Sequence, residues 1–242
     1  MSGRVLIVED HALVAIGLQL ALSARDYDVE SDSGPTPSDV VDHARRFAPH
    51  CVLLDLHLGR GLGSGVELIR PLAEAGAKVV MMTAESRRMA LAACLEAGAV
   101  GWIGKGALLD EVDAVLRAVI GGESLIGRTD QLALLDELWR ERARIQRGRS
   151  TFAPLSHRES LVLGALSDGL SADEIAESQF VALTTVRSQI RAVLRKLGVR
   201  SQAAAVALAG TYPELLPQRA RDGRDRRRIQ IGQLSCGPEF RR

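Results

Sequence analysis

Polar side chains stand at the ends of four short apolar runs in the first half of the sequence. Glu9 and Asp10 follow the run RVLIV, and Asp55 ends the run CVLLD. Thr83 ends the run KVVMMT, and Lys105 follows VGWIG. Because ligands in open α/β sheets bind beyond the carboxyl ends of the strands, we expect these side chains to converge at one edge of a sheet.

Brought together, these side chains could carry out phosphoryl transfer. Three carboxylates repel one another, so the group favours a hard divalent cation such as Mg²⁺, which takes oxygen ligands. With the cation bound, Asp55 can act as a nucleophile toward phosphorus. Lys105 can neutralise charge on the phosphoryl oxygens, and the Thr83 hydroxyl can donate a hydrogen bond to one of them. A lone strand-end Asp or Lys is usually a solvated terminus, so the prediction depends on the whole group.

The apolar pattern also predicts the elements that position these residues. Over residues 1–123, five short apolar runs alternate with five segments of helical periodicity. The first such segment has Leu13, Ile16 and Leu20 at helical spacing. Alternating strands and helices predict a doubly wound α/β domain, with a parallel sheet covered on both faces.

The motifs VLIVED, VLLDLHL, VVMMTAES and GWIGK resemble the receiver domain of bacterial response regulators. The resemblance covers residues 1 to about 122 and implies a five-stranded, flavodoxin-like parallel sheet. It makes Asp55 the phosphoacceptor, which takes a phosphoryl group from a sensor histidine kinase.

The resemblance also implies roles for the neighbours of Asp55. Thr83 and Lys105 would bind the phosphoryl group, and Trp102 stands where such domains carry a switch aromatic that is more usually Tyr or Phe. The ligands of Mg²⁺ would be Glu9, Asp10, Asp55 and the backbone carbonyl of His57.

The loop after Asp55 departs from that family pattern. Receivers commonly carry a proline there, whereas this loop alternates glycines at positions 59, 61, 63 and 65, which suggests a mobile or slowly ordering loop. A dinucleotide fold would require G-x-G-x-x-G at a first strand–helix turn, and the spacing differs. A phosphatase with an aspartate nucleophile would place a second Asp at position 57, where the chain has His57. That histidine either tunes dephosphorylation or faces solvent.

Charge is distributed unevenly and indicates a second module. Residues 1–123 carry a net charge of −6, and residues 154–242 carry +5. A basic half suggests a polyanionic partner. Between the two, residues 124–153 place Leu134, Leu138 and Trp139 among many charges, which predicts an amphipathic helical linker that packs on one domain or pairs with another subunit.

Residues 154–212 have an all-helical pattern. Ser156 with Glu159 and Ser171 with Glu174 have the spacing of capping boxes. The following helix turns a basic stripe outward, and a short helix followed by a basic one is typical of a helix-turn-helix, whose second helix enters the DNA major groove. A solvated helix face would show the same stripe. The candidate DNA contacts are Thr184, Thr185, Arg187, Ser188, Arg191 and Arg195.

The motifs LSHRE, GLSADEIA, TTVRSQI and KLGV resemble the LuxR-type (NarL/FixJ-like) helix-turn-helix over about 55 residues. Ala182 stands where the family usually has a capping Ser. The resemblance implies binding to an operator in double-stranded DNA, with homodimerisation on phosphorylation. Residues 213–242, which include the run RARDGRDRRR, predict a basic, disordered tail.

The remaining features narrow the functional class. Cys51, Cys94 and Cys236 have neither disulfide nor metal-ligand spacing, and no apolar run is long enough to span a bilayer. We therefore expect a soluble, cytoplasmic, non-enzymatic regulator of transcription, switched at Asp55 by a sensor kinase and without a membrane partner. Two alternatives stay open: a receiver gated by a ligand or partner without phosphate, and an aspartate-nucleophile phosphatase.

Overall fold

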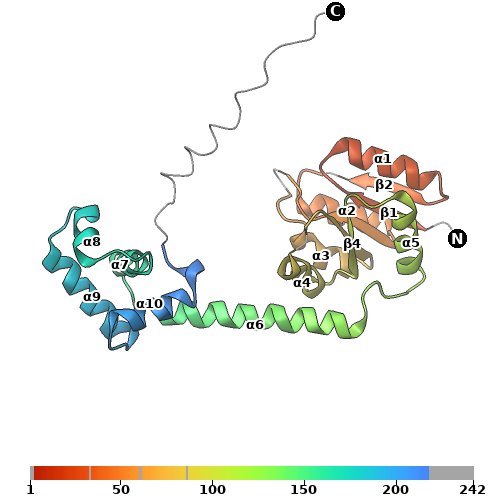
Figure 1. Ribbon diagram of the computed structural model, residues 1–242. Helices are drawn as coiled ribbons and strands as arrows, with labels where there is room; N and C mark the ends of the chain where they lie inside the picture. Colours follow the sequence, from red (N-terminus) through yellow and green to blue (C-terminus); the bar gives the residue numbers. More distant parts are fainter. Residues whose placement is uncertain (1–2, 33, 60–61, 86, 218–242) are drawn as a thin grey trace, which may run out of the picture. The chain divides into compact units, whose positions relative to one another are not determined.

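The computed structural model describes residues 3–32, 34–59, 62–85 and 87–217 (Figure 1). The chain forms two compact units, Met1–Glu141 and Arg142–Arg242.

A five-stranded parallel sheet forms the centre of the N-terminal unit, with strand order β2-β1-β3-β4-β5. This confirms the predicted flavodoxin-like, doubly wound fold. The inner strands are almost wholly apolar because helices cover both of their faces, whereas the edge strand β2 reads DVESD. The strands are β1 (Arg4–Val8), β2 (Asp28–Asp32), β3 (Cys51–Asp55), β4 (Lys78–Thr83) and β5 (Gly101–Gly104).

Two layers of helices cover the sheet (Figure 1). One face packs against α1 and α5, where Leu22 and Leu116 meet Ile7 and Leu53. The other face packs against α2, α3 and α4 through a second apolar cluster. These helices are α1 (Ala12–Ser23), α2 (Pro37–Phe47), α3 (Val66–Glu74), α4 (Arg88–Ala97) and α5 (Leu109–Ile120).

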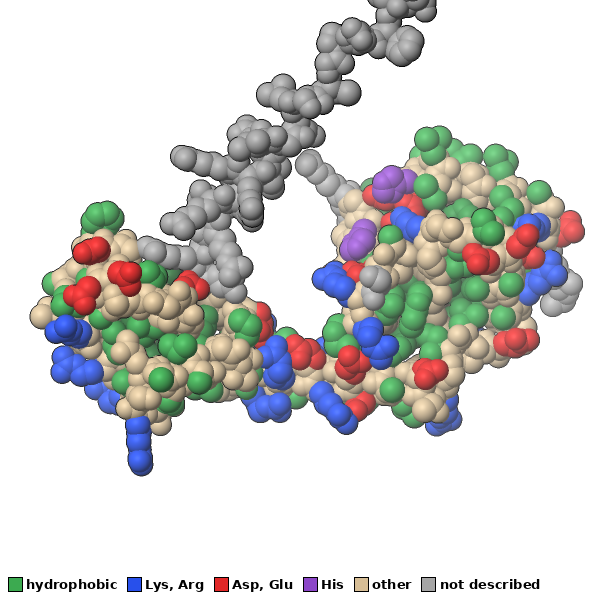
Figure 2. All heavy atoms as spheres, viewed as in Figure 1, with side chains coloured by type: hydrophobic (Ala, Val, Ile, Leu, Met, Phe, Trp, Pro, Cys, Tyr) green, Lys and Arg blue, Asp and Glu red, His purple; other side chains and the backbone are tan. Residues whose placement is uncertain are grey.

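Helix α1 forms where its apolar spacing predicted, but it turns those residues outward. Leu13, Ile16 and Leu20 are 88%, 52% and 68% exposed. Ala15 and Leu22 are buried instead. Figure 2 shows hydrophobic side chains on the surface over this part of the N-terminal unit. Helical periodicity thus located the helix but not its buried face.

Helix α6 (Arg128–Phe152) lies within the predicted linker and contributes to both units. In the N-terminal unit, Leu134 and Leu138 pack against Ala92 and Leu95 of α4. In the C-terminal unit, Phe152 belongs to an apolar cluster of its own. The amphipathic pattern of the linker is explained by these two packing sites on one helix.

The C-terminal unit is wholly helical in its described part. Helices α7, α8 and α9 share one apolar cluster, and α7, α9 and α10 share a second. Both predicted capping boxes are present, at the starts of α7 and α8. The elements are α7 (His157–Ser167), α8 (Ala172–Gln179), α9 (Leu183–Leu197), α10 (Gln202–Gly210) and the 3₁₀ helix η1 (Pro213–Leu215).

The start of the predicted tail packs on this unit. Pro213–Leu215 forms η1, and Leu216 is only 9% exposed because it lies in the cluster that holds Phe152 and Leu163. Residues 213–217 therefore differ from the prediction of a tail that begins at 213. Residues 218–242 lie outside the described part of the chain.

Cys51 and Cys94 are free thiols, in agreement with their spacing, and both are buried. Burial raises the pKa of Cys51 to about 12 and that of Cys94 to about 11, so both stay protonated and unreactive near neutral pH. Cys236 lies outside the described residues. In the part of the chain that is described, the helices are too short or too polar to traverse a bilayer.

Candidate functional site

The predicted strand-end residues gather at the carboxyl edge of the sheet. Glu9 and Asp10 follow β1 and Asp55 ends β3, which is the neighbouring strand. The strand order β2-β1-β3-β4-β5 changes direction between β1 and β3, and such a switch point is the usual ligand site of an open α/β sheet. Glu9 and Asp55 are each 1% exposed and Thr83 is 4% exposed, so a polar group is buried at the end of each of these strands.

Lys105 neutralises two of the buried carboxylates. Its Nζ lies 2.7 Å from Glu9 Oε2 and 2.7 Å from Asp55 Oδ2. Burial alone would lower the pKa of Lys105, but the hydrogen bonds to Asp55 and Glu9 outweigh it and raise that pKa. The lysine is therefore charged and holds the two carboxylates together across the sheet.

The second oxygen of Asp55 is unpaired. Asp55 Oδ1 is buried and has no hydrogen-bond partner among the described residues. A buried oxygen without a partner is costly, and a divalent cation or a bond to phosphorus would satisfy it. The residues thus fit the predicted Mg²⁺ site, since they offer a cluster of carboxylate oxygens.

Asp10 is held by the loop that follows β3. The backbone N–H of Gly59 donates to Asp10 Oδ2 at 2.8 Å. Burial raises the pKa of Asp10, but the Gly59 hydrogen bond and the charge of His11 outweigh it, so the net pKa lies below the usual value. The carboxylate is therefore ionised and oriented.

Two loop glycines allow close approach of this loop to the site. A Cβ at Gly59 would lie 2.6 Å from Asp10 Oδ2, and a Cβ at Gly65 would lie 2.0 Å from the backbone oxygen of Asp55. Gly65 also donates its N–H to Leu56 O at 2.9 Å. The glycines at these two positions are thus required by contact with the acidic site, which the alternating pattern alone did not indicate.

His11 belongs to the same cluster, although it was not among the predicted site residues. Its Nδ1 lies 2.8 Å from Glu9 Oε1 and 2.8 Å from Asp10 Oδ1. Hydrogen bonding to Glu9 and the nearby carboxylate charges raise the pKa of His11. Its position directly after the acidic pair was the available signal.

The remaining predicted residues occupy different places around the edge. The Thr83 hydroxyl oxygen accepts the N–H of Glu85 at 2.9 Å, and within the described residues its own hydrogen has no acceptor. Trp102 is half-buried and packs against the apolar cluster that joins α4 and α6. The His57 side chain is exposed, and its backbone bridges to Ser64.

In the C-terminal unit, all six predicted DNA-contact residues are exposed on α9: Thr184, Thr185, Arg187, Ser188, Arg191 and Arg195. Val186, Ile190 and Val193 on the opposite side of the helix are buried. Figure 2 shows Lys and Arg side chains gathered along an edge of this unit.

Local contacts set the orientation of α9. Phe180 adopts a left-handed conformation, φ 55°, in the turn between α8 and α9. Lys196 Nζ lies 2.7 Å from Glu159 Oε2, which ties the end of α9 to the start of α7. As expected, Ala182 provides no side-chain cap for α9.

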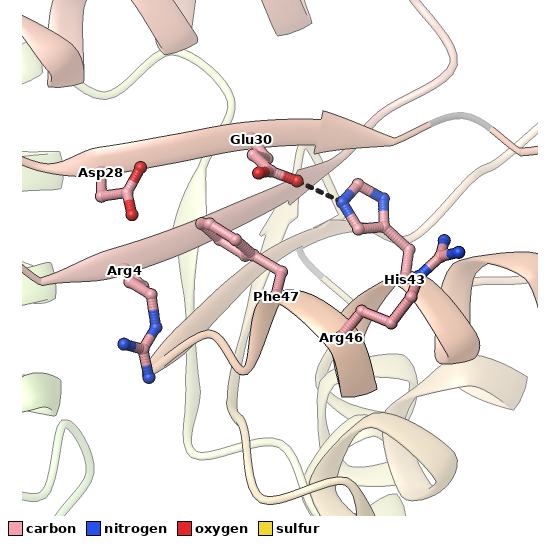
Figure 3. Close-up of a pocket in the computed structure, with 6 residues that line it drawn as sticks. All are labelled: Arg4, Asp28, Glu30, His43, Arg46 and Phe47. Carbon is pink, nitrogen blue, oxygen red and sulfur yellow. Dashed lines mark hydrogen bonds and ion pairs between the residues drawn. The ribbon is translucent and has the colours of Figure 1, made fainter.

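A separate polar pocket lies between β2 and α2 (Figure 3). His43 Nδ1 is 2.7 Å from Asp32 Oδ2, and its Nε2 is 2.5 Å from Glu30 Oε2. Burial lowers the pKa of His43, but the hydrogen bonds to Glu30 and Asp32 outweigh it and raise that pKa. Each ring nitrogen faces its own carboxylate, so His43 fastens α2 to the edge strand and offers no free atom to a ligand.

Two family models match the chain. The model described as the response regulator receiver domain matches residues 5–117. The model described as bacterial regulatory proteins, luxR family, matches residues 153–209.

Individual relatives match along nearly their whole length. The transcriptional regulatory protein YdfI of Bacillus subtilis is 30% identical over 85% of this chain and 94% of its own. The nitrate/nitrite response regulator protein NarP of Escherichia coli is 30% identical over 85% of this chain and 93% of its own. Among solved structures, the RcsB response regulator of Salmonella typhimurium aligns over 86% of this chain and all of its own, with 21% identity and a TM-score of 0.48.

Proposed function

The chain belongs to the DNA-binding transcriptional response regulators of two-component systems, with a receiver domain and a LuxR-family helix-turn-helix domain, and on that premise we propose that Asp55 is its phosphoacceptor. The observation that carries this proposal is the buried, unpaired Oδ1 of Asp55 beside the Lys105 ammonium.

In this proposal, a sensor histidine kinase supplies the phosphoryl group. An oxygen of Asp55 attacks phosphorus, an O–P bond forms, and the P–N bond to the kinase histidine breaks, with its electron pair returning to the imidazole. Lys105 stabilises the negative charge that develops on the phosphoryl oxygens, because its ammonium already contacts Asp55 Oδ2. The free hydroxyl hydrogen of Thr83 then has a phosphoryl oxygen as its acceptor.

Mg²⁺ would be held by Glu9, Asp10, Asp55 and the His57 carbonyl, and when bound it would neutralise charge on the phosphoryl oxygens. The chain prepares its own side of that site. The Gly59 N–H fixes Asp10, and Lys105 keeps Glu9 and Asp55 from repelling each other.

Trp102 connects the carboxyl edge of the sheet with α6 through its side-chain contacts. It lies on β5, packs on the sheet core, and also contacts the cluster of Ala92, Leu95, Leu134 and Leu138. A shift of Thr83 toward a phosphoryl group would alter the packing of β4 on β5, and Trp102 would transmit that change to the α4–α6 contact. The phosphorylated protein then dimerises and places two copies of α9 in successive major grooves of an operator.

Phosphorylation is tested on the full chain by intact mass spectrometry with a small-molecule phosphodonor and Mg²⁺. We expect one phosphoryl adduct, absent from Asp55→Asn. An adduct that persists in Asp55→Asn overturns the phosphoacceptor assignment. Operator binding that needs no phosphodonor, and is unchanged in Asp55→Asn, would favour regulation without phosphate.

The DNA surface is tested by the salt dependence of binding. Arg187→Ala and Arg191→Ala should each weaken DNA binding, and each lost phosphate contact should reduce the slope of log K against log salt by about 0.9. Arg149→Ala is the control, because Arg149 is exposed on α6. Unchanged DNA binding by the double variant Arg187→Ala/Arg191→Ala would show that the exposed face of α9 does not contact DNA.

A further inference from the structure

His11 places a nitrogen donor at the acidic edge of the sheet. Ligand-capable atoms of Glu9, Asp10, His11 and Asp55 all lie within 4.8 Å of one another. A response regulator site built from carboxylates and a carbonyl would offer oxygen alone. The imidazole therefore changes the donor set of the site.

The spacing of these atoms suits one cation. In an octahedral site with bonds of about 2.1–2.2 Å, neighbouring ligand atoms are about 3 Å apart and opposite ones about 4.3 Å apart. The two 2.8 Å separations from His11 Nδ1 to Glu9 Oε1 and Asp10 Oδ1 are close to the first value. The 4.8 Å limit on every separation in the group exceeds the second value by about half an ångström, and His11 and Asp10, which are exposed, can adjust by that amount.

An independent observation points to a ligand in the same place. Asp55 is 1% exposed, and its Oδ1 has no partner among the described residues. A cation bound by this cluster through Asp55 Oδ1 would satisfy that oxygen. The His11 side chain is 68% exposed, so a cation that arrives from solvent can reach its ring.

We propose that His11 Nδ1 is a ligand of the divalent cation at the phosphoacceptor site, and that it shifts the preference of the site from Mg²⁺ toward Mn²⁺. This inference rests on the proposed phosphoacceptor function of Asp55. Mg²⁺ is a hard ion that takes oxygen ligands and keeps several waters. An imidazole nitrogen binds transition ions better, and affinities rise along the first-row series beyond Mn²⁺.

The test uses the full chain without a polyhistidine tag. Pulsed electron paramagnetic resonance of bound Mn²⁺ detects directly coordinated nitrogen. The variants are His11→Gln, the matched control His57→Gln, and Asp55→Asn. Isothermal titration calorimetry of the same proteins measures the affinities for Mn²⁺ and Mg²⁺.

We expect nitrogen coupling in the wild type and in His57→Gln, and none in His11→Gln. Mn²⁺ affinity should fall by about tenfold or more in His11→Gln, while Mg²⁺ affinity falls less. Unchanged thermal unfolding of His11→Gln in chelator confirms that the variant is folded.

Other outcomes separate the two proposals. Mn²⁺ binding that weakens in Asp55→Asn but shows no nitrogen coupling overturns the role of His11 and leaves the Asp55 site standing. Mn²⁺ affinity that is equal in wild type and Asp55→Asn would show that the cation does not bind at the Asp55 site, and would overturn both the cation site and the role of His11. Coupling that is lost only in His57→Gln assigns the nitrogen to His57 and overturns the proposal.

Discussion

The indole Nε1 of Trp139 donates a hydrogen bond to Glu96 Oε1 at 2.8 Å, and so joins α6 to α4 within the N-terminal unit. The Arg88 guanidinium adds an ion pair to Glu137 at 3.1 Å. Because Trp102 of β5 packs on the same apolar cluster, the edge of the sheet and the start of α6 are connected through adjacent side chains.

Leu138→Ala should loosen this contact. Leu138 is 6% exposed, and removal of a buried leucine side chain typically costs about 2–5 kcal/mol. We expect faster amide hydrogen exchange over residues 128–141 and a lower free energy of unfolding. Leu132→Ala is the control, since Leu132 is 56% exposed and its loss should change stability by less than about 0.5 kcal/mol. Equal exchange in the two variants would contradict the packing of α6 on α4.

Lys105→Met should make the stability of the protein depend more strongly on Mg²⁺. Glu9 and Asp55 are buried and lose their shared counter-charge, which we expect to cost about 1–3 kcal/mol, less than for a fully buried pair because the Lys105 side chain is 30% exposed. An added cation replaces that charge and stabilises the folded state by mass action.

Thermal unfolding in chelator and in Mg²⁺ measures this effect. The rise in midpoint on adding Mg²⁺ should be larger for Lys105→Met than for wild type. Lys78→Met serves as the control, because Lys78 is exposed at the start of β4. An equal rise in all three proteins would show that Lys105 does not compensate the carboxylates.

Two glycine substitutions in one loop should have different consequences. In Gly59→Ala the new Cβ meets the end of the Asp10 side chain, which can swing away, so Mg²⁺ affinity should fall with little loss of stability. In Gly65→Ala the Cβ meets the Asp55 backbone, which cannot, so overpacking should cost about 1–3 kcal/mol or more.

Calorimetric Mg²⁺ titration and chemical denaturation distinguish the two effects. Gly106→Ala is the matched control, because no atom lies within 4 Å of a Cβ built there. If Gly59→Ala and Gly65→Ala lose stability equally, the loop is looser than these contacts indicate.

Glu159→Gln should destabilise the C-terminal unit at neutral pH and have less effect in acid. The hydrogen bond from Lys196, with that from Ser156, lowers the pKa of Glu159 below its ordinary value of 4.5. Because the pKa of Glu159 is lower in the folded state, the ionised carboxylate stabilises the fold fully above about pH 4.5. This stabilisation is lost as pH falls through the pKa that Glu159 has in the folded state. Hydrogen bonds to charged groups contribute about 1.5–3 kcal/mol.

Chemical denaturation at pH 7 and at pH 4 measures the free energy of unfolding of wild type and of Glu159→Gln. The difference in this free energy between the two proteins should be smaller at the lower pH. Glu177→Gln provides the control, because Glu177 is exposed on α8. A gap that stays constant with pH would mean that Glu159 acts through packing and not through its charge.

The sequence by itself determined the two fold classes, both capping boxes and the family. Each depends on local pattern: apolar periodicity along a strand or helix, and residues three apart at a helix start. Strand-end position also predicted that Glu9, Asp55 and Lys105 meet, because the ends of parallel strands share an edge. The roles of these residues and of the α9 arginines stay predictions.

Only the tertiary structure decided which atoms are paired and which surfaces are covered. Trp139 and Glu96 are 43 residues apart, so no local pattern states that they touch. The unpaired Asp55 Oδ1, the place of His11 beside two carboxylates and the exposed apolar face of α1 arise in the same way. Each depends on how distant segments fill space around the sheet, and packing of that kind is specified by the whole chain at once.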